Sequence, residues 1–129
     1  MNHWLNELSQ INIDGSQYWY LNDKLHRDND LPAVIFANGT QCWYQHGLLH
    51  RDNDFPAVTY ADVTQYWYQK GKLHRDNDKP AMICATGTLK WYKNGILHRD
   101  NQPAIIYADG CLEWWQNGIN LADLSRREI

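Results

Sequence analysis

The tetrapeptide His-Arg-Asp-Asn occurs four times in this 129-residue chain and holds the residues best suited to chemistry. Histidine and aspartate transfer protons and bind metal ions, and arginine binds anions. The four copies begin at His26, His50, His74 and His98, so they recur every 24 residues. A fixed period of this size is typical of tandem-repeat proteins, in which each unit buries its apolar surface against its neighbours.

This regular spacing argues against a catalytic or metal site. If each unit adds two strands, equivalent histidines lie roughly 9 to 10 Å apart, whereas metal ligands lie about 2 Å from one ion. The Asp-Asn-Asp triplets resemble part of a calcium loop but lack its Gly and its distant Glu. His-Arg-Asp also matches the catalytic loop of protein kinases, which needs a Gly-rich phosphate loop and a strand lysine in a far longer chain. We therefore expect no enzyme activity, no metal and no cofactor.

We expect the tetrapeptides instead to form a structural ladder. Each imidazole would pin its loop by hydrogen bonding, and each arginine is long enough to reach an aspartate in an adjacent unit. Such pairs would fix the stacking register even if each exposed pair contributes only about 0 to 1 kcal/mol. The ladder comprises His26, Arg27, Asp28, His50, Arg51, Asp52, His74, Arg75, Asp76, His98, Arg99 and Asp100.

The elements between the tetrapeptides read as short strands. Turn pairs such as Asn38-Gly39 and Asn94-Gly95 alternate at about 8 and 16 residues, and aromatic or β-branched segments such as 33–37 and 41–45 lie between them. Each repeat is then a β-hairpin followed by a loop that ends in proline. The sequence predicts an all-β fold: an elongated, single-layer, twisted antiparallel sheet of tandem β-hairpin repeats, solenoid-like, with short capping segments at both ends.

The chain is interpreted as a single repeat domain over residues 1–129. Residues 1–16 would be an N-terminal cap and first half-hairpin, followed by repeats at 17–40, 41–64, 65–88 and 89–111, a partial repeat at 112–118 and a C-terminal cap at 119–129. In the first cap, the apolar residues Trp4, Leu5, Leu8 and Ile11 have helical spacing. In the second, Asn120 can cap a short helix with Leu121, Leu124 and Ile129 on one side and Arg126 and Arg127 in its last turn.

The aromatic pairs before each histidine are the candidate binding residues. Neighbouring strand residues point to opposite faces, so each Trp-Tyr pair places one aromatic on each face of a sheet. Contiguous exposed apolar strips usually mark an interaction surface. We favour as the accessible strip Tyr20, Tyr44, Tyr68, Tyr92 and Trp115. The alternative is that cross-strand stacking alone explains these aromatics.

The motif Trp-Tyr-x-Asn-Gly-x-Leu-His at residues 91–98, followed by a strand and Asp109-Gly110, resembles the MORN repeat over about residues 11–118. The resemblance implies an elongated, twisted single-layer sheet that scaffolds, dimerises or binds partners. The chain departs from the usual His-Gly-x-Gly, because His-Arg-Asp-Asn-Asp-x-Pro-Ala stands there. That variant is similar to repeats of giant DNA viruses, phages and some bacteria and protists. A lipid or partner surface tied to the Gly-rich loops carries over poorly.

Composition narrows the class of protein. A net charge of −3 and a pI near 6.0 give no broad attraction to nucleic acid or anionic lipid. The chain has no apolar run that could span a bilayer, its start lacks the features of a secretory signal, and its three cysteines form no CxxC pair. We expect a cytoplasmic protein, in the host cytoplasm if it is virus-encoded.

The function expected is that of a non-catalytic repeat scaffold. It would mediate a protein–protein interaction or self-association, for example as a homodimer, through a sheet face or an end. One alternative is an antitoxin-like inhibitor, because similar repeats occur in proteins of that kind. A less favoured alternative is a single-stranded nucleic-acid-binding module, which the spaced arginines and aromatics would support and the flanking aspartates oppose.

Overall fold

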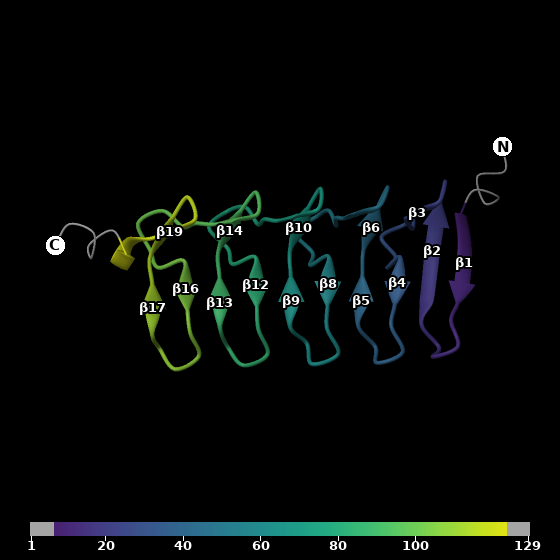
Figure 1. The fold of residues 1–129 in the computed structure, drawn as a ribbon, viewed down its shortest axis with the longest axis horizontal. Helices are drawn as coiled ribbons and strands as arrows, with labels where there is room; N and C mark the ends of the chain where they lie inside the picture. Colours follow the sequence, from purple (N-terminus) through teal and green to yellow (C-terminus); the bar gives the residue numbers. More distant parts are fainter. Residues whose placement is uncertain (1–6, 124–129) are drawn as a thin grey trace.

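A computed structural model describes residues 7–123, and their regular secondary structure is almost entirely β-strand. One long antiparallel sheet runs through them in the strand order β1-β2-β4-β5-β8-β9-β12-β13-β16-β17, with β3 paired to β2. Figure 1 shows these strands side by side along an elongated molecule, with the two ends of the chain at opposite ends. The predicted all-β fold, an elongated antiparallel sheet of tandem hairpins, is confirmed.

The strands are short, and most have two residues. The long sheet contains β1 (Glu7–Ile11), β2 (Gln17–Leu21), β3 (Lys24–Leu25), β4 (Val34–Ile35), β5 (Gln41–Cys42), β8 (Val58–Thr59), β9 (Gln65–Tyr66), β12 (Met82–Ile83), β13 (Leu89–Lys90), β16 (Ile105–Ile106) and β17 (Leu112–Glu113). Four small hairpins are formed by β6 (Tyr44–Gln45) with β7 (Leu48–Leu49), β10 (Tyr68–Gln69) with β11 (Lys72–Leu73), β14 (Tyr92–Lys93) with β15 (Ile96–Leu97), and β18 (Trp115–Gln116) with β19 (Ile119–Asn120).

The structural repeat has the predicted period but another starting point. Each full unit begins after a proline with a strand of the long sheet, turns back, forms a small hairpin and ends in the His-Arg-Asp-Asn loop. We number the units 1 (7–32), 2 (33–56), 3 (57–80), 4 (81–103) and 5 (104–123). The sequence frames such as 17–40 cut each long hairpin just after its turn.

Backbone geometry explains the hairpin turns of the long sheet. In unit 2, Phe36 N donates to Thr40 O at 2.8 Å, and Gly39 N donates to Phe36 O at 2.9 Å. Gly39 has φ +94°, a left-handed conformation that glycine adopts without a steric penalty. Unit 3 has Val63 in this place at φ +68°, which is costly for a β-branched residue.

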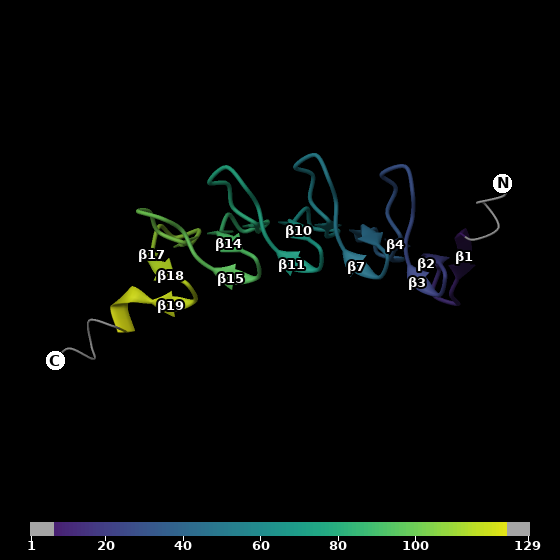
Figure 2. The same ribbon diagram turned by 90° about the horizontal axis from the view of Figure 1, so that it is seen from above.

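The chain leaves the long sheet at each repeated tryptophan. Trp43 belongs to neither β5 nor β6, and its backbone N–H donates to Ala57 O of the next unit while its C=O accepts from His50 N. Beyond this corner the small hairpin turns away from the sheet. Figure 2 shows the hairpins, such as β10–β11, on one side and the loops that follow them on the other.

The main core lies between the long sheet and the small hairpins. Val34, Cys42 and Val58 are buried on one face of the sheet, and Tyr44 and Leu49 of the β6–β7 hairpin pack against them. We call this the inner face. Cross-strand partners share a face, so the register assigns to it Tyr18, Val34, Cys42, Val58, Tyr66, Met82, Lys90, Ile105 and Glu113.

Within residues 1–16, the described part contains a strand and no helix, although Leu8 and Ile11 have helical spacing. Leu8 and Ile11 belong to β1, which pairs with β2 over five residue pairs from Glu7↔Leu21 to Ile11↔Gln17. Pairing with an otherwise open strand edge satisfies backbone groups that an isolated short helix would leave to water. Trp4 and Leu5 lie outside the described residues.

The C-terminal helix start is confirmed. Residues 121–123 are helical, and the Asn120 side-chain oxygen accepts from Ala122 N at 3.0 Å, as an N-cap residue does. The predicted helix residues Leu124, Arg126, Arg127 and Ile129 lie outside the described part of the chain.

Candidate functional site

The loop histidines join consecutive units. His26 Nδ1 accepts from the backbone N–H of His46, in unit 2, at 3.0 Å, and His26 Nε2 lies 2.8 Å from Asp28 Oδ1. Because the backbone N–H can only donate, Nδ1 is the acceptor, and the proton on Nε2 is donated to Asp28. The arrangement recurs as His50 with Lys70, His74 with Asn94 and His98 with Asn117. Each imidazole thus bonds both to an aspartate of its own loop and to the backbone of the next unit.

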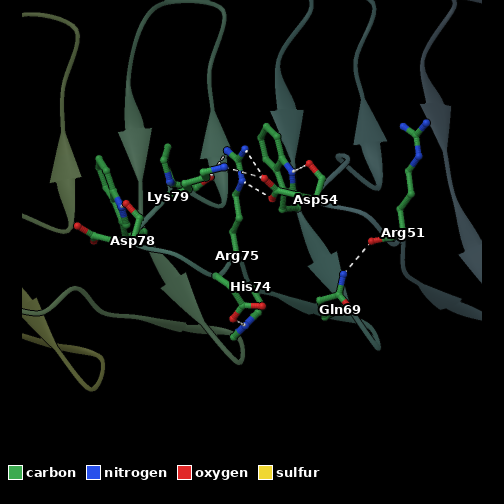
Figure 3. Close-up of polar contacts among 11 residues, drawn as sticks. Arg51, Asp54, Gln69, His74, Arg75, Asp78 and Lys79 are labelled. Atoms are coloured by element: carbon green, nitrogen blue, oxygen red, sulfur yellow. Dashed lines mark hydrogen bonds and ion pairs between the residues drawn. The ribbon is translucent and has the colours of Figure 1, made fainter.

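Three arginines, Arg51, Arg75 and Arg99, form ion pairs across unit boundaries. Arg51 donates through Nε and Nη2 to the two carboxylate oxygens of Asp30 in unit 1, at 2.8 and 3.2 Å. Its Nη1 donates to Pro56 O, and its guanidinium lies 3.8 Å from the ring centroid of Trp43. Arg75 with Asp54, and Arg99 with Asp78, repeat the geometry. Figure 3 shows the Arg75–Asp54 pair.

The carboxylates of these ion pairs were missed from sequence. The predicted set contains Asp28, Asp52, Asp76 and Asp100, which hold the histidines, whereas the arginine partners are Asp30, Asp54 and Asp78. Two aspartates two residues apart look alike in a sequence. One signal in the sequence points to the correct pairing. The fourth loop has Gln102 where the other loops have the arginine-binding aspartate, and the next unit has no Arg eight residues after Trp114. The aspartate and its arginine are therefore absent together.

A tryptophan and a glutamine add further hydrogen bonds between units, and we call this set of contacts across a boundary the clasp. Trp43 Nε1 donates to the backbone oxygen of Asp30 at 3.1 Å, and Gln45 Nε2 donates to Arg27 O at 2.9 Å. The tryptophan bond recurs at Trp67 and Trp91, and the glutamine bond recurs at Gln69 and Gln116. The polar groups of these loops are thus largely engaged within the array. Across residues 7–123, no three His, Cys, Asp or Glu side chains converge on a site for a metal ion.

Ion pairing sets the protonation of the clasp aspartates. Hydrogen bonds from Arg75 hold the pKa of Asp54 below its usual value, and Lys79 at 3.0 Å lowers it further. Arg99 lowers the pKa of Asp78 in the same way. Both carboxylates are therefore charged at neutral pH. Their side chains are 42% and 61% exposed, so solvent screening keeps the energetic contribution of each pair small.

On the opposite side, the inner face and the small hairpins enclose an angle that we call the trough. Its wall is the row of tyrosines and leucines on the hairpins, some of which bury Val34, Cys42 and Val58 against the sheet. Its accessible floor consists of the half-buried residues of the inner face, such as Tyr18, Tyr66, Met82 and Lys90. The tyrosine row coincides with the strip favoured from sequence: Tyr20, Tyr44, Tyr68, Tyr92 and Trp115. All five side chains are half-buried and pair across their hairpins with Leu25, Leu49, Leu73, Leu97 and Asn120.

Of the neighbouring tryptophans, three are buried, Trp19 is half-buried with Arg27 over its ring, and Trp114 is exposed. Trp43, Trp67 and Trp91 are only 6–7% exposed, because an arginine lies over each ring and a loop carbonyl accepts from each indole. Trp114 is 43% exposed. Ala122 stands where its arginine would be, so no guanidinium within residues 7–123 covers this ring.

The wall tyrosines have hydroxyls without protein partners. Burial raises the pKa values of Tyr44, Tyr68 and Tyr92, yet none of the three hydroxyls has a hydrogen-bond partner in the described structure. Tyr107 is different, since its hydroxyl donates to Glu113 at 2.9 Å. A row of half-buried donors therefore faces the trough and is open to an acceptor from outside the chain.

More aromatic rings extend the floor toward the hairpin turns. Phe36 meets Tyr18 edge to face at 6.2 Å, and Tyr60 meets Tyr66 in the same way at 5.2 Å. Phe36 and Tyr60 are 37% and 38% exposed. Such aromatic rings provide apolar contact area with little loss of side-chain freedom.

The floor residues of units 1–3 are uncharged, and unit 4 contributes the lysine Lys90. Lys90 is half-buried between Met82 and Ile105, its cross-strand neighbours, and it forms no ion pair with any described residue. Glu113, two strands further, already accepts from Tyr107 and from Trp115 Nε1. Lys90 thus places one uncompensated positive charge in an aromatic trough.

Comparison of the chain with protein-family models and with curated proteins finds no match. Within residues 7–123, no helix has the length and apolar character needed to cross a bilayer.

Proposed function

We propose that this protein is a MORN-like, non-catalytic repeat scaffold that binds a protein partner through the trough. The observation that carries the proposal is the contrast between the two sides of the array. On the loop side, polar side chains form hydrogen bonds that join the units. The trough instead presents half-buried aromatic rings and tyrosine hydroxyls with no partner in the described chain. Partly exposed aromatics that retain a polar group are typical of protein interfaces.

The repetitive geometry supports binding over catalysis. A catalytic site needs one asymmetric set of acid, base and stabilising groups. The units here repeat their histidine, arginine and aspartate contacts with nearly the same distances, as the His Nδ1 bonds of 2.9–3.0 Å illustrate. We also place the protein in the cytoplasm, because its three cysteines are free, as thiols in a reducing compartment are.

A matched pair of variants tests the proposed surface. Tyr60→Arg puts a charge on the trough, and Gln65→Arg puts the same charge on the opposite face of the same hairpin. In quantitative affinity purification from a native lysate, we expect Tyr60→Arg to lose the specific partner and Gln65→Arg to keep it. Retention of the same partner by both variants would contradict the proposal.

Self-association through the trough is tested with the same proteins. If the partner is a second copy, sedimentation velocity should show a dimer for the wild type and for Gln65→Arg, and a monomer for Tyr60→Arg. A dimer that persists in Tyr60→Arg would place the contact elsewhere, for example at an end of the sheet.

A further inference from the structure

We propose that the trough binds a proline-rich segment in the polyproline II conformation that carries an acidic residue opposite Lys90. This inference rests on the proposed function and specifies the chemistry of the partner. Three features lead to it: the period of the tyrosine row, the free hydroxyls of that row and the position of the one positive charge on the floor.

The period of the trough matches that of a polyproline II helix. Each unit adds two strands to the long sheet, and strands lie about 4.7–4.9 Å apart, so wall tyrosines recur about every 9.4–9.8 Å. A polyproline II helix repeats every three residues, or about 9.3 Å. Over three units the mismatch is about 0.3 to 1.5 Å, within the reach of side-chain adjustment.

Other regular segments fit this period less well. An α-helix returns to the same face after seven residues, about 10.5 Å, which accumulates about 2 to 3 Å of mismatch over three units. A β-strand repeats about every 6.6–6.8 Å, so its side chains would fall out of step within one unit.

The hydroxyls of the wall match the backbone of such a segment. Polyproline II has no internal hydrogen bonds, so its carbonyls remain available as acceptors. The hydroxyls of Tyr44, Tyr68 and Tyr92 have no acceptor within the described chain and can each donate to one carbonyl per turn. The rings beside them offer the aromatic contacts on which proline-rich segments dock.

Charge defines the remaining element of the partner. The half-buried floor residues Tyr18, Tyr66 and Met82 are uncharged, which suits prolines. Lys90, the next floor residue, has no counter-ion in residues 7–123. A carboxylate at that point of the segment would pair with the ammonium group. A nucleic-acid strand would need a cation at each phosphate along the trough, and only one is there.

The test uses synthetic peptides with blocked ends and the purified full chain. One probe has a run of nine prolines followed by a glutamate, and the other has a glutamate followed by nine prolines, so that both chain directions are covered. The controls are a peptide of ten prolines and a ten-residue Gly-Ser peptide that ends in glutamate. Isothermal titration calorimetry should show that one acidic oligoproline binds more tightly than the neutral oligoproline and that the Gly-Ser peptide does not bind.

Variants localise the binding. Tyr68→Phe removes only a hydroxyl and should weaken every oligoproline about 2- to 12-fold, the equivalent of one hydrogen bond. Lys90→Gln should weaken only the acidic oligoproline, by up to about fivefold. Gln65→Ala, on the opposite face, should change neither affinity. No oligoproline binding, or binding that Tyr68→Phe and Lys90→Gln leave unchanged, would overturn the inference.

The two proposals fail in distinguishable ways. If oligoprolines do not bind but Tyr60→Arg still loses the specific partner, the trough is an interface for another kind of segment. If Tyr60→Arg keeps that partner, the proposed function itself is wrong.

Discussion

Arg75 and Asp54, 21 residues apart, form a two-pronged ion pair across the boundary between units 2 and 3, with Nε–Oδ1 at 2.9 Å and Nη2–Oδ2 at 3.3 Å. The same guanidinium lies 3.8 Å from the ring centroid of Trp67. The Arg75 side chain thus binds the loop of the preceding unit and also covers an aromatic ring of its own unit. A single unit cannot satisfy these contacts, so the clasp couples the stability of neighbouring units.

Replacing the guanidinium of Arg75 with an ammonium group tests the clasp. Arg75→Lys keeps the charge but loses the bidentate geometry and most of the ring contact. We expect the free energy of unfolding to fall by about 1 kcal/mol, from the sum of an exposed ion pair and a cation–π contact. Urea denaturation measures it. Lys93→Ala, at an exposed lysine with no side-chain partner in the described chain, should stay near the wild type; equal losses in both would argue against the clasp.

Acid should weaken the clasps in a defined pH range. The pKa of Asp54 is lowered mainly by its hydrogen bonds to Arg75. The folded state therefore binds protons less readily than the unfolded chain, in which the pKa of an aspartate is about 4. The stabilisation is therefore complete above about pH 4 and is lost as the pH falls through the lower folded-state pKa. Urea denaturation between about pH 7 and about pH 2.5 should show this loss. Asp54→Asn should flatten the decline, and an unchanged profile would exclude this role.

The 24-residue period and the all-β fold could be predicted from sequence, because the repeated motif and the turn pairs mark them directly. That the arginines reach across unit boundaries could be expected from their length, but their partners could not be assigned. The role of each aspartate could not be predicted. Asp28 and Asp30 share type and loop, and only the path of the backbone aims one at His26 and the other at Arg51. The N-terminal strand was also hidden, because Leu8 and Ile11 fit a helical spacing while the pairing of β1 with β2 depends on distant residues.

The aromatic pairs illustrate a second limit. Strand alternation predicts one aromatic row on each face, but Trp43 lies at a corner between β5 and β6, outside both strands. Its burial comes from Arg51 and the loop carbonyl of Asp30, which are contacts across sequence distance. Trp114, at the equivalent position of unit 5 but without that arginine, is exposed.

A backbone strain in unit 3 offers a stabilising substitution. Val63 has φ +68° at the turn position where unit 2 has Gly39 at φ +94°. A left-handed conformation costs a non-glycine residue about 1–2 kcal/mol, so Val63→Gly should raise the free energy of unfolding by about 1 kcal/mol after the greater entropy of the unfolded glycine is counted.

The reverse change is its matched control. A side chain at Gly39 would meet nothing within 4 Å, so Gly39→Val should destabilise through backbone conformation alone and by a similar amount. Thermal and urea denaturation measure both variants. A destabilised Val63→Gly protein would show that the valine contributes contacts that outweigh the strain.

The first two histidines of the row should contribute different amounts to the free energy of unfolding. The side chain of His26 is 3% exposed and that of His50 is 16% exposed, and each accepts from a backbone N–H of the next unit. Water can replace the lost acceptor more readily at His50. We expect His26→Ala to cost about 2–3 kcal/mol and His50→Ala about 1 kcal/mol, measured by urea denaturation. A larger cost at His50 would contradict this ranking.

The thiols should react at very different rates. Burial raises the pKa of Cys42 to about 11, and its side chain is part of the core with Val34 and Val58. Cys111 is exposed, and its pKa is raised by hydrogen bonding to Asp109. At about pH 8 a thiol-specific reagent should label Cys111 in the folded protein and Cys42 only after unfolding. Mass spectrometry of labelled peptides distinguishes them, and rapid labelling of Cys42 would show that the inner face opens.

Removal of one whole unit tests the modular array most directly. Deletion of residues 57–80 joins Pro56 to Ala81, which restores the Pro-Ala step of every full unit and leaves Asp54 to receive Arg99. The measurement is the maximum dimension from small-angle X-ray scattering of the folded protein. We predict a molecule shorter than the wild type by about 9–10 Å, the width of two strands. An unfolded chain, or a folded one whose length is unchanged, would contradict a translational array of clasped units.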